Sequence, residues 1–264
     1  MNTMRIALCQ PKVLMSREAA VEKAAEMVRE AAGCGAQLVV LPEMFHCPYA
    51  PEYFPVYAET AEGEMFRIMS SWARDNGVYL VGGSIPEREK DKIYNTCFCF
   101  DPQGKLVARH RKIHLFDVDI PGQITFQESD YFSPGDTETL FDTPFGKVGV
   151  AICFDQRFPG LIRSLAKQGA MLVCTPAQFN NVTGPRHWDT LVKARALDNQ
   201  IYYAACSAAT DPDFSYKAYG HSCVVDPNGQ ILVDAGTEEN IIYCEIDQNV
   251  IDSTRKEMPT FLHS

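Results

Sequence analysis

The sequence predicts an α/β fold in which two similar sheets pack face to face, with helices on the outside. Stretches typical of strands and of helices alternate along the chain, which is the pattern of α/β proteins. The strand candidates are continuous apolar runs, as expected for parallel strands buried on both faces. The chain also repeats itself: "GAQLVVLPEMF" (35–45) aligns with "GAMLVCTPAQF" (169–179), and "FDPQGKLV" (100–107) mirrors "VDPNGQILV" (225–233) with one extra residue. We therefore expect two βαβ-containing halves related by pseudo-symmetry.

The first half begins with the strand "MRIALC" (4–9), followed by a helix over about 17–32. Ser16 is the predicted N-cap of this helix, and glycines just after it favour its end. Its apolar face is formed by Ala20, Ala24, Met27 and Ala31. The other expected elements of this half are strands at 37–41, 78–82, 93–100 and 106–111, and a helix at 63–75.

The second half repeats this order. Its expected elements are a strand at "KVGVAIC" (147–153), a helix at 158–168, a strand at 171–175, a helix at 186–199, a strand at 201–207 and a hairpin that turns on "DPNG" (226–229). At 264 residues the chain is longer than an average domain, but single α/β domains of this size are common. We therefore expect residues 1–264 to form one domain.

Charge and composition exclude several classes of partner. The net charge of −10 and the pI of about 5.1 argue against nonspecific nucleic-acid binding, which depends on clustered Lys and Arg. The N-terminus lacks the pattern of a signal peptide, and no apolar run approaches the roughly 20 residues that span a bilayer. Ten cysteines without a secretion signal indicate reduced thiols in a cytoplasmic protein. We expect no nucleic-acid and no membrane partner.

Metal and nucleotide sites are not expected either. Five of the six histidines are scattered through loop-like surroundings, and no zinc-like ligand pair spacing repeats; the five are His46, His110, His114, His187 and His221. The two thiols of "CFC" (97–99) face one way along a strand but do not by themselves form a zinc site. "VGGS" (81–84) lacks the lysine of a P-loop and the spacing of a dinucleotide loop. The sequence therefore predicts no metal and no cofactor.

Cys153, in "GVAICFDQRFPG" (149–160), is a candidate nucleophile. It ends an apolar strand and precedes a predicted helix with Pro159 in its first turn. Sites in such folds lie beyond the carboxyl ends of strands, where backbone N–H groups can bind an oxyanion and a helix N-terminus favours the thiolate. The alternative is a buried structural cysteine, as expected for Cys9 at the mirrored strand end.

Three charged residues are further candidates. Glu43 follows "VVLP", whereas the repeat has Ala177 at the equivalent position; a scaffold role tolerates the same residue twice, but a catalytic role needs it once. Lys112 follows the last strand of the first half, and Glu128 lies in a long connection without clear periodicity, of a kind that tends to be functional. The alternatives are a loop-capping carboxylate, a solvated lysine and a surface carboxylate, respectively.

Taken together, "LPEMF" around Glu43, "RKIHLFD" around Lys112 and "GVAICFDQRFP" around Cys153 resemble the nitrilase superfamily of carbon–nitrogen hydrolases. The resemblance extends from "RIALCQ" to "PNGQILVDAGTEENIIYCEID". It implies a single carbon–nitrogen hydrolase domain with an α-β-β-α sandwich of two packed sheets and internal pseudo-symmetry. Gly160 departs from the pattern, since many members have Glu after "RFP".

More narrowly, the chain is similar to the ω-amidase branch, which removes ammonia from the terminal amide of 2-oxo acids such as 2-oxoglutaramate and 2-oxosuccinamate. The stretches that carry this similarity are "YFPVYAE" (53–59), "GGSIPE" (82–87), "YNTC" (94–97), "RKIHLFDVDIPGQITFQES" (111–129), "TGPRHW" (183–188) and "RALDNQIYYAACS" (195–207). The resemblance implies a small-molecule amide substrate, a thioester intermediate and no cofactor. Such proteins commonly assemble, so we expect a homodimer or a higher homo-oligomer.

The resemblance also implies residue roles. Glu43 would be the base for Cys153, and Lys112 and the backbone N–H of Phe154 would hold the oxyanion. Glu128, which matches a second glutamate of the family, would orient the lysine or the substrate amide. The oxo-acid end needs a cationic or N–H-rich anchor. Candidates for substrate binding are Arg157 and Arg186, with aromatic walls from Tyr49, Phe116 and Phe179; either arginine can instead pair with a surface carboxylate.

Alternatives remain open at this point. The same scaffold can act on deaminated glutathione, N-carbamoyl compounds or nitriles, and the three catalytic candidates do not separate these substrates. A different class is a non-catalytic partner protein that keeps the fold, against which the intact Glu43, Lys112 and Cys153 argue. A third is a zinc-binding Cys/His protein.

Overall fold

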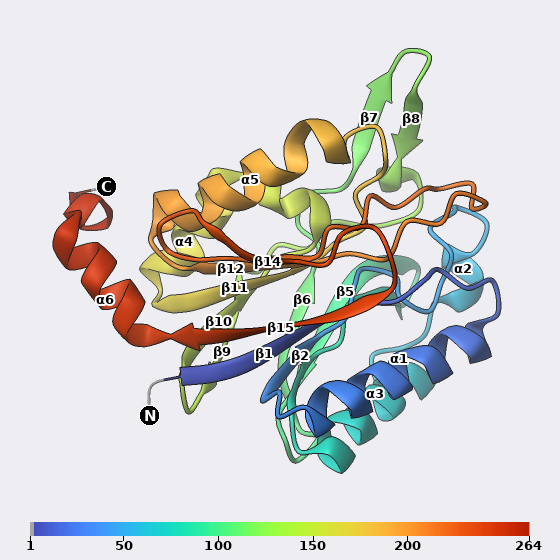
Figure 1. Cartoon of the computed structure of the whole chain (residues 1–264). Coiled ribbons are helices and arrows are strands. Elements are labelled where there is room, and N and C mark those ends of the chain that lie inside the picture. The colour runs from blue at the N-terminus through green and yellow to red at the C-terminus, as the bar shows by residue number, and fades with distance from the viewer. Residues whose placement is uncertain (1–2, 264) are drawn as a thin grey trace.

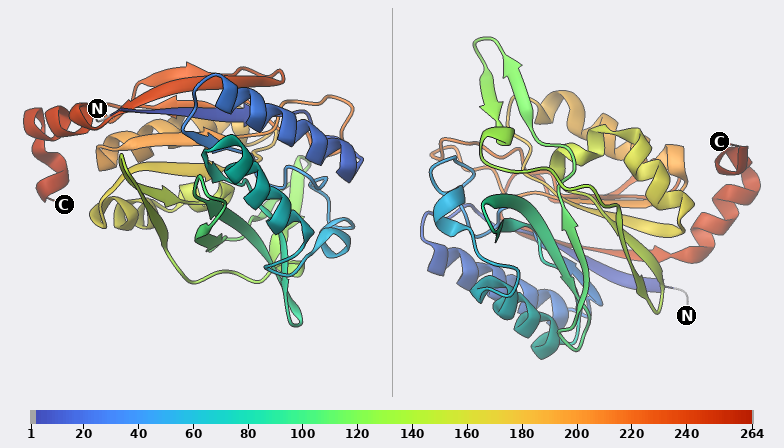
Figure 2. Two further views of the ribbon diagram at one scale, coloured as in Figure 1. Left: turned by 90° about the horizontal axis from the view of Figure 1, so that it is seen from below. Right: turned by 180° about the vertical axis from the view of Figure 1, so that it is seen from behind.

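The structure is a computed structural model that describes residues 3–263. Two sheets pack face to face, with α1 (Arg17–Gly33) and α3 (Glu64–Asn76) on the outside of one, and α4 (Pro159–Lys167) and α5 (Gly184–Asn199) on the outside of the other (Figure 1). Seen from two further directions, the helical layers stay separated by the sheets (Figure 2). The predicted α-β-β-α order is therefore confirmed.

The first sheet has seven strands in the described chain, in the order β15-β1-β2-β3-β5-β4, with β6 also paired to β5. They are β1 (Thr3–Gln10), β2 (Leu38–Val40), β3 (Tyr79–Val81), β4 (Ile85–Glu89), β5 (Lys92–Phe100), β6 (Leu106–Arg111) and β15 (Asn240–Asp247). The central strands β1, β2 and β3 run parallel, and the flanking strands β15 and β5 are antiparallel to them.

The second sheet repeats this plan with six strands of the described residues, in the order β14-β13-β12-β11-β10-β9. They are β9 (Thr139–Thr143), β10 (Gly146–Val150), β11 (Ala170–Pro176), β12 (Tyr202–Cys206), β13 (Cys223–Val225) and β14 (Ile231–Asp234). Here β10, β11 and β12 are parallel and their neighbours β9 and β13 antiparallel. The repeated segments therefore fold into equivalent strands, and the predicted pseudo-symmetry is confirmed.

The inner faces of the two sheets share one hydrophobic core. Ile6 and Leu38 of the first sheet belong to it together with Val150 and Leu172 of the second. Ala7, next to Ile6, points the other way and packs in the core beneath α1 and α3, as the two-residue period of a strand requires. Burial on both faces explains why these strands are continuous apolar runs.

The helices begin and end close to the predicted positions. Ser16 caps α1, because its Oγ accepts a hydrogen bond from the backbone N–H of Ala19 at 3.2 Å. Pro159 stands in the first turn of α4, where its missing N–H costs nothing. Two short helices lie outside these layers: α2 (Phe54–Tyr57) and α6 (Gln248–Glu257), the latter carrying the C-terminal end of the chain (Figure 1).

Several elements were not predicted from the sequence: β4, β9, β15, α2, α6, and the hairpin of β7 (Asp117–Ile120) and β8 (Ile124–Gln127). This hairpin lies within the connection 113–137 and projects away from the sheets (Figures 1 and 2). In both strands exposed and half-buried residues alternate. Each strand has only four residues, in which polar and apolar side chains alternate, so neither contains the continuous apolar run that marks the buried strands.

The strand predicted at 147–153 ends earlier than expected, at Val150. Cys153 instead begins the short 3₁₀ helix η2 (Cys153–Arg157), which precedes α4. The reason is local: the backbone N–H of Ile152 donates to Asp155 Oδ2 at 3.0 Å instead of to a neighbouring strand. The chain therefore leaves the sheet just before Cys153.

All ten cysteines are free thiols. Cys97 and Cys99 have their sulfurs 3.8 Å apart, so they face one way as predicted, and Cys9 is fully buried. Among the described residues, no helix is long and apolar enough to cross a membrane.

Candidate active site

Three charged side chains from distant segments meet in the interior. Lys112 Nζ donates to Glu43 Oε1 and to Glu128 Oε2, both at 2.8 Å. All three side chains are fully buried. A buried lysine between two carboxylates is far less costly than the isolated charges would be. The structure thus joins three of the residues that the sequence singled out.

Secondary structure brings these side chains together. Glu43 lies just beyond β2, Lys112 directly follows β6, and Glu128 begins the 3₁₀ helix η1 (Glu128–Asp130) after the β7–β8 hairpin. The backbone N–H of Lys112 donates to the carbonyl of Asn95 on β5 at 2.8 Å, which continues the pairing of β6 with β5. Met44, next to Glu43, has a left-handed backbone with φ of 51°. Such strained residues cluster at functional sites.

Asn95, which sequence analysis did not assign, holds the two carboxylates at a fixed separation. Its Nδ2 donates to Glu43 Oε1 at 2.8 Å and to Glu128 Oε1 at 3.1 Å. It lies within "YNTC", a stretch quoted above only for its resemblance to ω-amidases. Its position inside a buried strand gives no other signal of a polar role.

Glu43 and Glu128 differ in whether both of their carboxylate oxygens accept hydrogen bonds. Glu128 Oε2 accepts from Lys112 and also from the backbone N–H of Phe116 at 2.6 Å, and its Oε1 accepts from Asn95. Glu43 Oε1 has two donors, whereas Glu43 Oε2 is buried without a hydrogen-bond partner among residues 3–263. Glu43 therefore keeps a free acceptor oxygen and Glu128 does not.

Cys153 begins η2 and is only 5% exposed. Its φ of 45° is left-handed, a conformation that costs energy for a side chain other than glycine. This conformation sits at the turn from the sheet into η2. The backbone conformation of Cys153 is therefore imposed by contacts with the surrounding structure, because cysteine does not favour it intrinsically.

Electrostatics tie Cys153 to the charged cluster. Burial raises the pKa of the Cys153 thiol well above its ordinary value; the Glu43 carboxylate raises it further, while Lys112 and a hydrogen bond from the Gln178 backbone lower it. Burial also raises the pKa of Glu43, against the opposing effect of Lys112. Burial works against the charge of Lys112, but Glu128 and Glu43 outweigh it and hold the lysine pKa well above its usual range. The resting site holds a thiol and an ammonium.

A narrow pocket opens beside Cys153. Its lining residues are Phe116, Cys153, Phe154, Gln178, Phe179, Thr183 and Tyr216. Phe116 and Phe179 were expected as aromatic walls, whereas Gln178, Thr183 and Tyr216 were not identified from the sequence. Thr183 is in "TGPRHW", and the other two carried no distinguishing signal.

Tyr49, the third expected wall, packs behind this pocket. Its ring lies 4.6 Å from that of Tyr216, between centroids. Its hydroxyl is buried and has no hydrogen-bond partner in the described part of the chain. Burial and then the charges of Glu128 and Glu43 raise the Tyr49 pKa. Tyr49 therefore presents a free hydroxyl close to the charged cluster.

The two arginine candidates differ in their surroundings. The guanidinium of Arg157 lies over the rings of Phe179 and Phe154, at 4.9 and 5.4 Å from their centroids. Arg186 is exposed and donates to Gln123 Oε1 at 2.8 Å. Neither forms an ion pair with a carboxylate of residues 3–263. Only Arg157 contacts the walls of the pocket.

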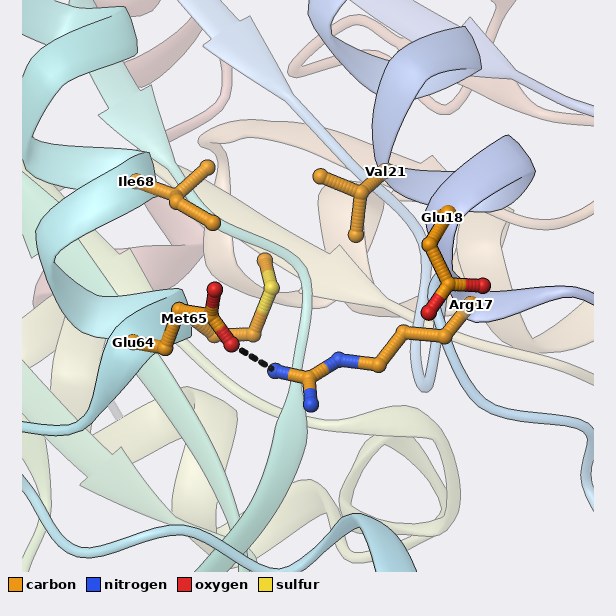
Figure 3. A pocket seen from close by; sticks show the side chains of 6 residues that line it. All are labelled: Arg17, Glu18, Val21, Glu64, Met65 and Ile68. Atoms are coloured by element: carbon orange, nitrogen blue, oxygen red, sulfur yellow. Dashed lines mark ion pairs between the residues drawn. The ribbon is translucent and has the colours of Figure 1, made fainter.

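The rest of the molecule was compared with this site for metal ligands and for a second nucleophile. Within residues 3–263, no three His, Cys, Asp or Glu side chains are grouped so as to hold a metal ion. A surface hollow between α1 and α3 is lined by Arg17, Glu18, Val21, Glu64, Met65 and Ile68 (Figure 3). Its arginine is bound to Glu64 at 3.4 Å and to Glu59. This hollow offers no nucleophile.

A model of the carbon-nitrogen hydrolase family matches residues 5–256, and the chain belongs to this family. It is 50% identical over 259 residues to omega-amidase NIT2 of Mus musculus, covering 98% of this chain and 94% of that protein. It is 48% identical over 261 residues to omega-amidase NIT2 of Homo sapiens, covering 99% and 95%.

The fold has a close match among solved structures. The crystal structure of Saccharomyces cerevisiae Nit3, a member of branch 10 of the nitrilase superfamily, matches with a TM-score of 0.90 and 41% identity over 97% of this chain and 94% of that one. The predicted resemblance to the nitrilase superfamily is confirmed. The chain is an amidohydrolase whose substrates are small-molecule amides.

Proposed function

We propose that the chain is an ω-amidase that releases ammonia from the terminal amide of small 2-oxo dicarboxylic acid monoamides, such as 2-oxoglutaramate and 2-oxosuccinamate. The observation that carries the proposal is the free, buried Oε2 of Glu43 in a cluster that acts electrostatically on the Cys153 thiol. Nearly full-length identity of about half to proteins named omega-amidase supports the substrate class.

In the first step Glu43 removes the thiol proton while the Cys153 sulfur attacks the amide carbonyl. The raised pKa of Cys153 means that the thiol is not ionised at rest, so a base must act during attack. A glutamate whose pKa is itself raised is a stronger base than an ordinary one. No histidine is needed.

The negative charge that develops on the carbonyl oxygen is held by Lys112 and the backbone N–H of Phe154. An ammonium has three N–H donors, and two of those on Lys112 are used by Glu43 and Glu128. The third has no acceptor among the described residues and is available for the oxyanion. Loss of one such donor commonly costs about 3–4 kcal/mol of transition-state stabilisation.

Collapse of the tetrahedral intermediate expels ammonia, which receives the proton held by Glu43, and leaves a thioester on Cys153. Glu43 then activates the water that hydrolyses the thioester. Glu128 accepts hydrogen bonds at both carboxylate oxygens. Its role is therefore to orient Lys112 rather than to transfer protons.

The substrate carboxylate is assigned to Arg157. This guanidinium lacks a carboxylate partner among residues 3–263 and lies against two walls of the pocket, Phe154 and Phe179. Phe116 forms another wall, and Tyr49 offers its free hydroxyl from behind Tyr216. Arg186 is exposed and bound to Gln123, which favours Arg157 over Arg186 as the anchor.

An ammonia-release assay tests the substrate class. The panel contains 2-oxoglutaramate, 2-oxosuccinamate, deaminated glutathione, an N-carbamoyl amino acid and a nitrile. We expect turnover of the first two above the others, and an acyl adduct on Cys153 by mass spectrometry that Cys153→Ala lacks. Turnover of deaminated glutathione, an N-carbamoyl compound or a nitrile alone would replace the ω-amidase assignment with that specificity. No turnover of any amide would favour a non-catalytic partner protein.

Three broader features are part of the proposal. The chain forms one domain over residues 1–264, it assembles as a homodimer or higher homo-oligomer, and it acts in the cytoplasm. The connected hydrophobic core that the two sheets share supports the first, and ten free thiols support the last. Light scattering of the purified protein tests the assembly.

A further inference from the structure

Asp155 lies two residues after Cys153 and is fully buried. Its carboxylate accepts four hydrogen bonds. Oδ1 accepts from the backbone N–H of His114 at 2.9 Å and from His114 Nδ1 at 2.8 Å. Oδ2 accepts from Ile152 N at 3.0 Å and lies 3.1 Å from His110 Nε2.

These partners lie on both sides of Lys112. His110 is two residues before Lys112 and His114 two residues after it. The Asp155 carboxylate therefore binds the segment that carries Lys112 at two residues, His110 and His114. Its hydrogen bond from Ile152 N also fixes the residue just before Cys153. Cys153 and Lys112 are 41 residues apart in the chain, as are His114 and Asp155.

We propose that Asp155, through His110 and His114, is a positioning residue that sets the placement of the Cys153 sulfur relative to the Lys112 ammonium. This inference rests on the proposed function, since it assumes that these two groups act on one carbonyl. None of the three positioning residues lines the pocket beside Cys153. They act through the backbone that carries the reacting groups.

Two features show that the contact is held firmly. Burial alone would raise the pKa of Asp155, but hydrogen bonds from His110 and His114 hold it well below its usual value, so the carboxylate stays ionised. His110 is fully buried, with Nδ1 3.1 Å from Thr139 Oγ1, and the His114 ring stacks on Phe158 at 3.5 Å between centroids. Both imidazole rings are therefore also held by contacts other than those with Asp155.

The left-handed backbone of Cys153 explains why such support is needed. A φ of 45° persists only where the surroundings over-determine it. The bond from Ile152 N to Asp155 Oδ2 closes a tight turn around Cys153. Without this bond the turn can relax and carry the sulfur away from the oxyanion donors. A displacement of about 1 Å can reduce turnover about 100-fold.

Variants of His114 give the most direct test, because His114 is about one-quarter exposed and its replacement leaves the core intact. His114→Ala removes the side-chain donor, whereas His114→Asn puts an amide N–H near the place of Nδ1. Steady-state kinetics of the full-length protein are measured with the best amide of the panel. We expect His114→Ala to lower kcat about 10- to 100-fold with KM unchanged, and His114→Asn to restore most of it.

Asp155→Asn supplies a second, independent variant. It keeps the shape of the side chain but turns an acceptor into a donor, which repels the Ile152 N–H or a histidine. We expect a larger loss of kcat and a slower reaction of Cys153 with iodoacetamide, at an unchanged KM. Asp234→Asn is the matched control: Asp234 pairs with His221 at 3.1 Å and with Gly236 N, but on β14, and we expect wild-type kinetics.

The results of these experiments distinguish a failure of the positioning role from a failure of the proposed substrate class. If wild type acts on another amide rather than on a 2-oxo acid amide, the substrate assignment fails and the positioning role is tested with that amide. Wild-type kcat in both His114→Ala and Asp155→Asn would overturn the positioning role. A loss of kcat in His114→Ala that His114→Asn does not reduce, or a matching rise in KM, would overturn it as well.

Discussion

Asn95 and Glu43 are 52 residues apart in the sequence, yet Asn95 Nδ2 donates to Glu43 Oε1 at 2.8 Å. The same amide nitrogen reaches Glu128. Since Lys112 binds the same two carboxylates, an amide and an ammonium together fix both glutamates. Of the four carboxylate oxygens, Oε2 of Glu43 is the one without a hydrogen-bond donor among residues 3–263, and it is available to act as a base.

Asn95→Ala tests the importance of this amide. Each glutamate loses one hydrogen bond, and bonds to charged groups are worth about 1.5–3 kcal/mol each. We expect the free energy of unfolding, measured in urea, to fall by about 3–6 kcal/mol, and kcat to fall at least about 10-fold because Glu43 is no longer aligned. Asn76→Ala is a control, since Asn76 donates to the Trp72 carbonyl and to no carboxylate of residues 3–263. Equal effects of the two variants would contradict a special role for Asn95.

The pH dependence of kcat/KM should show the raised pKa of Glu43. Only the ionised carboxylate can accept the thiol proton, so activity is present above the pKa of Glu43 and is lost as the pH falls through it. Because burial raises this pKa, the acidic limb should lie above the ordinary value of about 4.3. Glu43→Gln should abolish the limb and lower kcat by about 10²–10⁴. A limb at or below the ordinary value would count against Glu43 as the base.

Arg157→Leu should raise KM for 2-oxoglutaramate about 10- to 100-fold, since a hydrogen-bonded pair of charges contributes about 1.5–3 kcal/mol. Hydrolysis of an amide without a carboxylate, such as propionamide, should change little. Arg186→Leu is the matched control, because Arg186 is exposed and bound to Gln123. The assignment of the anchor is wrong if both substrates respond alike to Arg157→Leu, or if Arg186→Leu has the larger effect.

The sequence predicted the parts of this molecule that repeat or lie next to a buried strand. Glu43 was identified because the internal repeat pairs it with Ala177, and such a comparison needs no structure. The partners of Asp155 were not identified, because His110 and His114 are 45 and 41 residues away from it. Their contact depends on how η2 packs against the end of β6, which no local pattern encodes.

Asn95 was hidden for a different reason. It lies between Tyr94 and Thr96 in a strand that is buried from Tyr94 to Phe100, and nothing in this local pattern indicates the two carboxylates. The β7–β8 hairpin was missed because its residues alternate between exposed and half-buried, without an apolar run. In both cases tertiary contacts, rather than local propensity, decide the structure.

The stability of the charged cluster depends on Lys112. With Lys112→Met, the carboxylates of Glu43 and Glu128 remain buried without their cation, and breaking a buried ion pair in this way costs about 3–5 kcal/mol. Removing one of the two charges, in Lys112→Met/Glu128→Gln, should recover part of the lost free energy of unfolding. Neither variant should regain activity, because the third N–H of Lys112 is the proposed donor to the oxyanion. Urea unfolding measures the effect on stability and ammonia release the effect on activity, on the same preparations. If the double variant is no more stable than Lys112→Met, repulsion between the two carboxylates is not what destabilises the single variant.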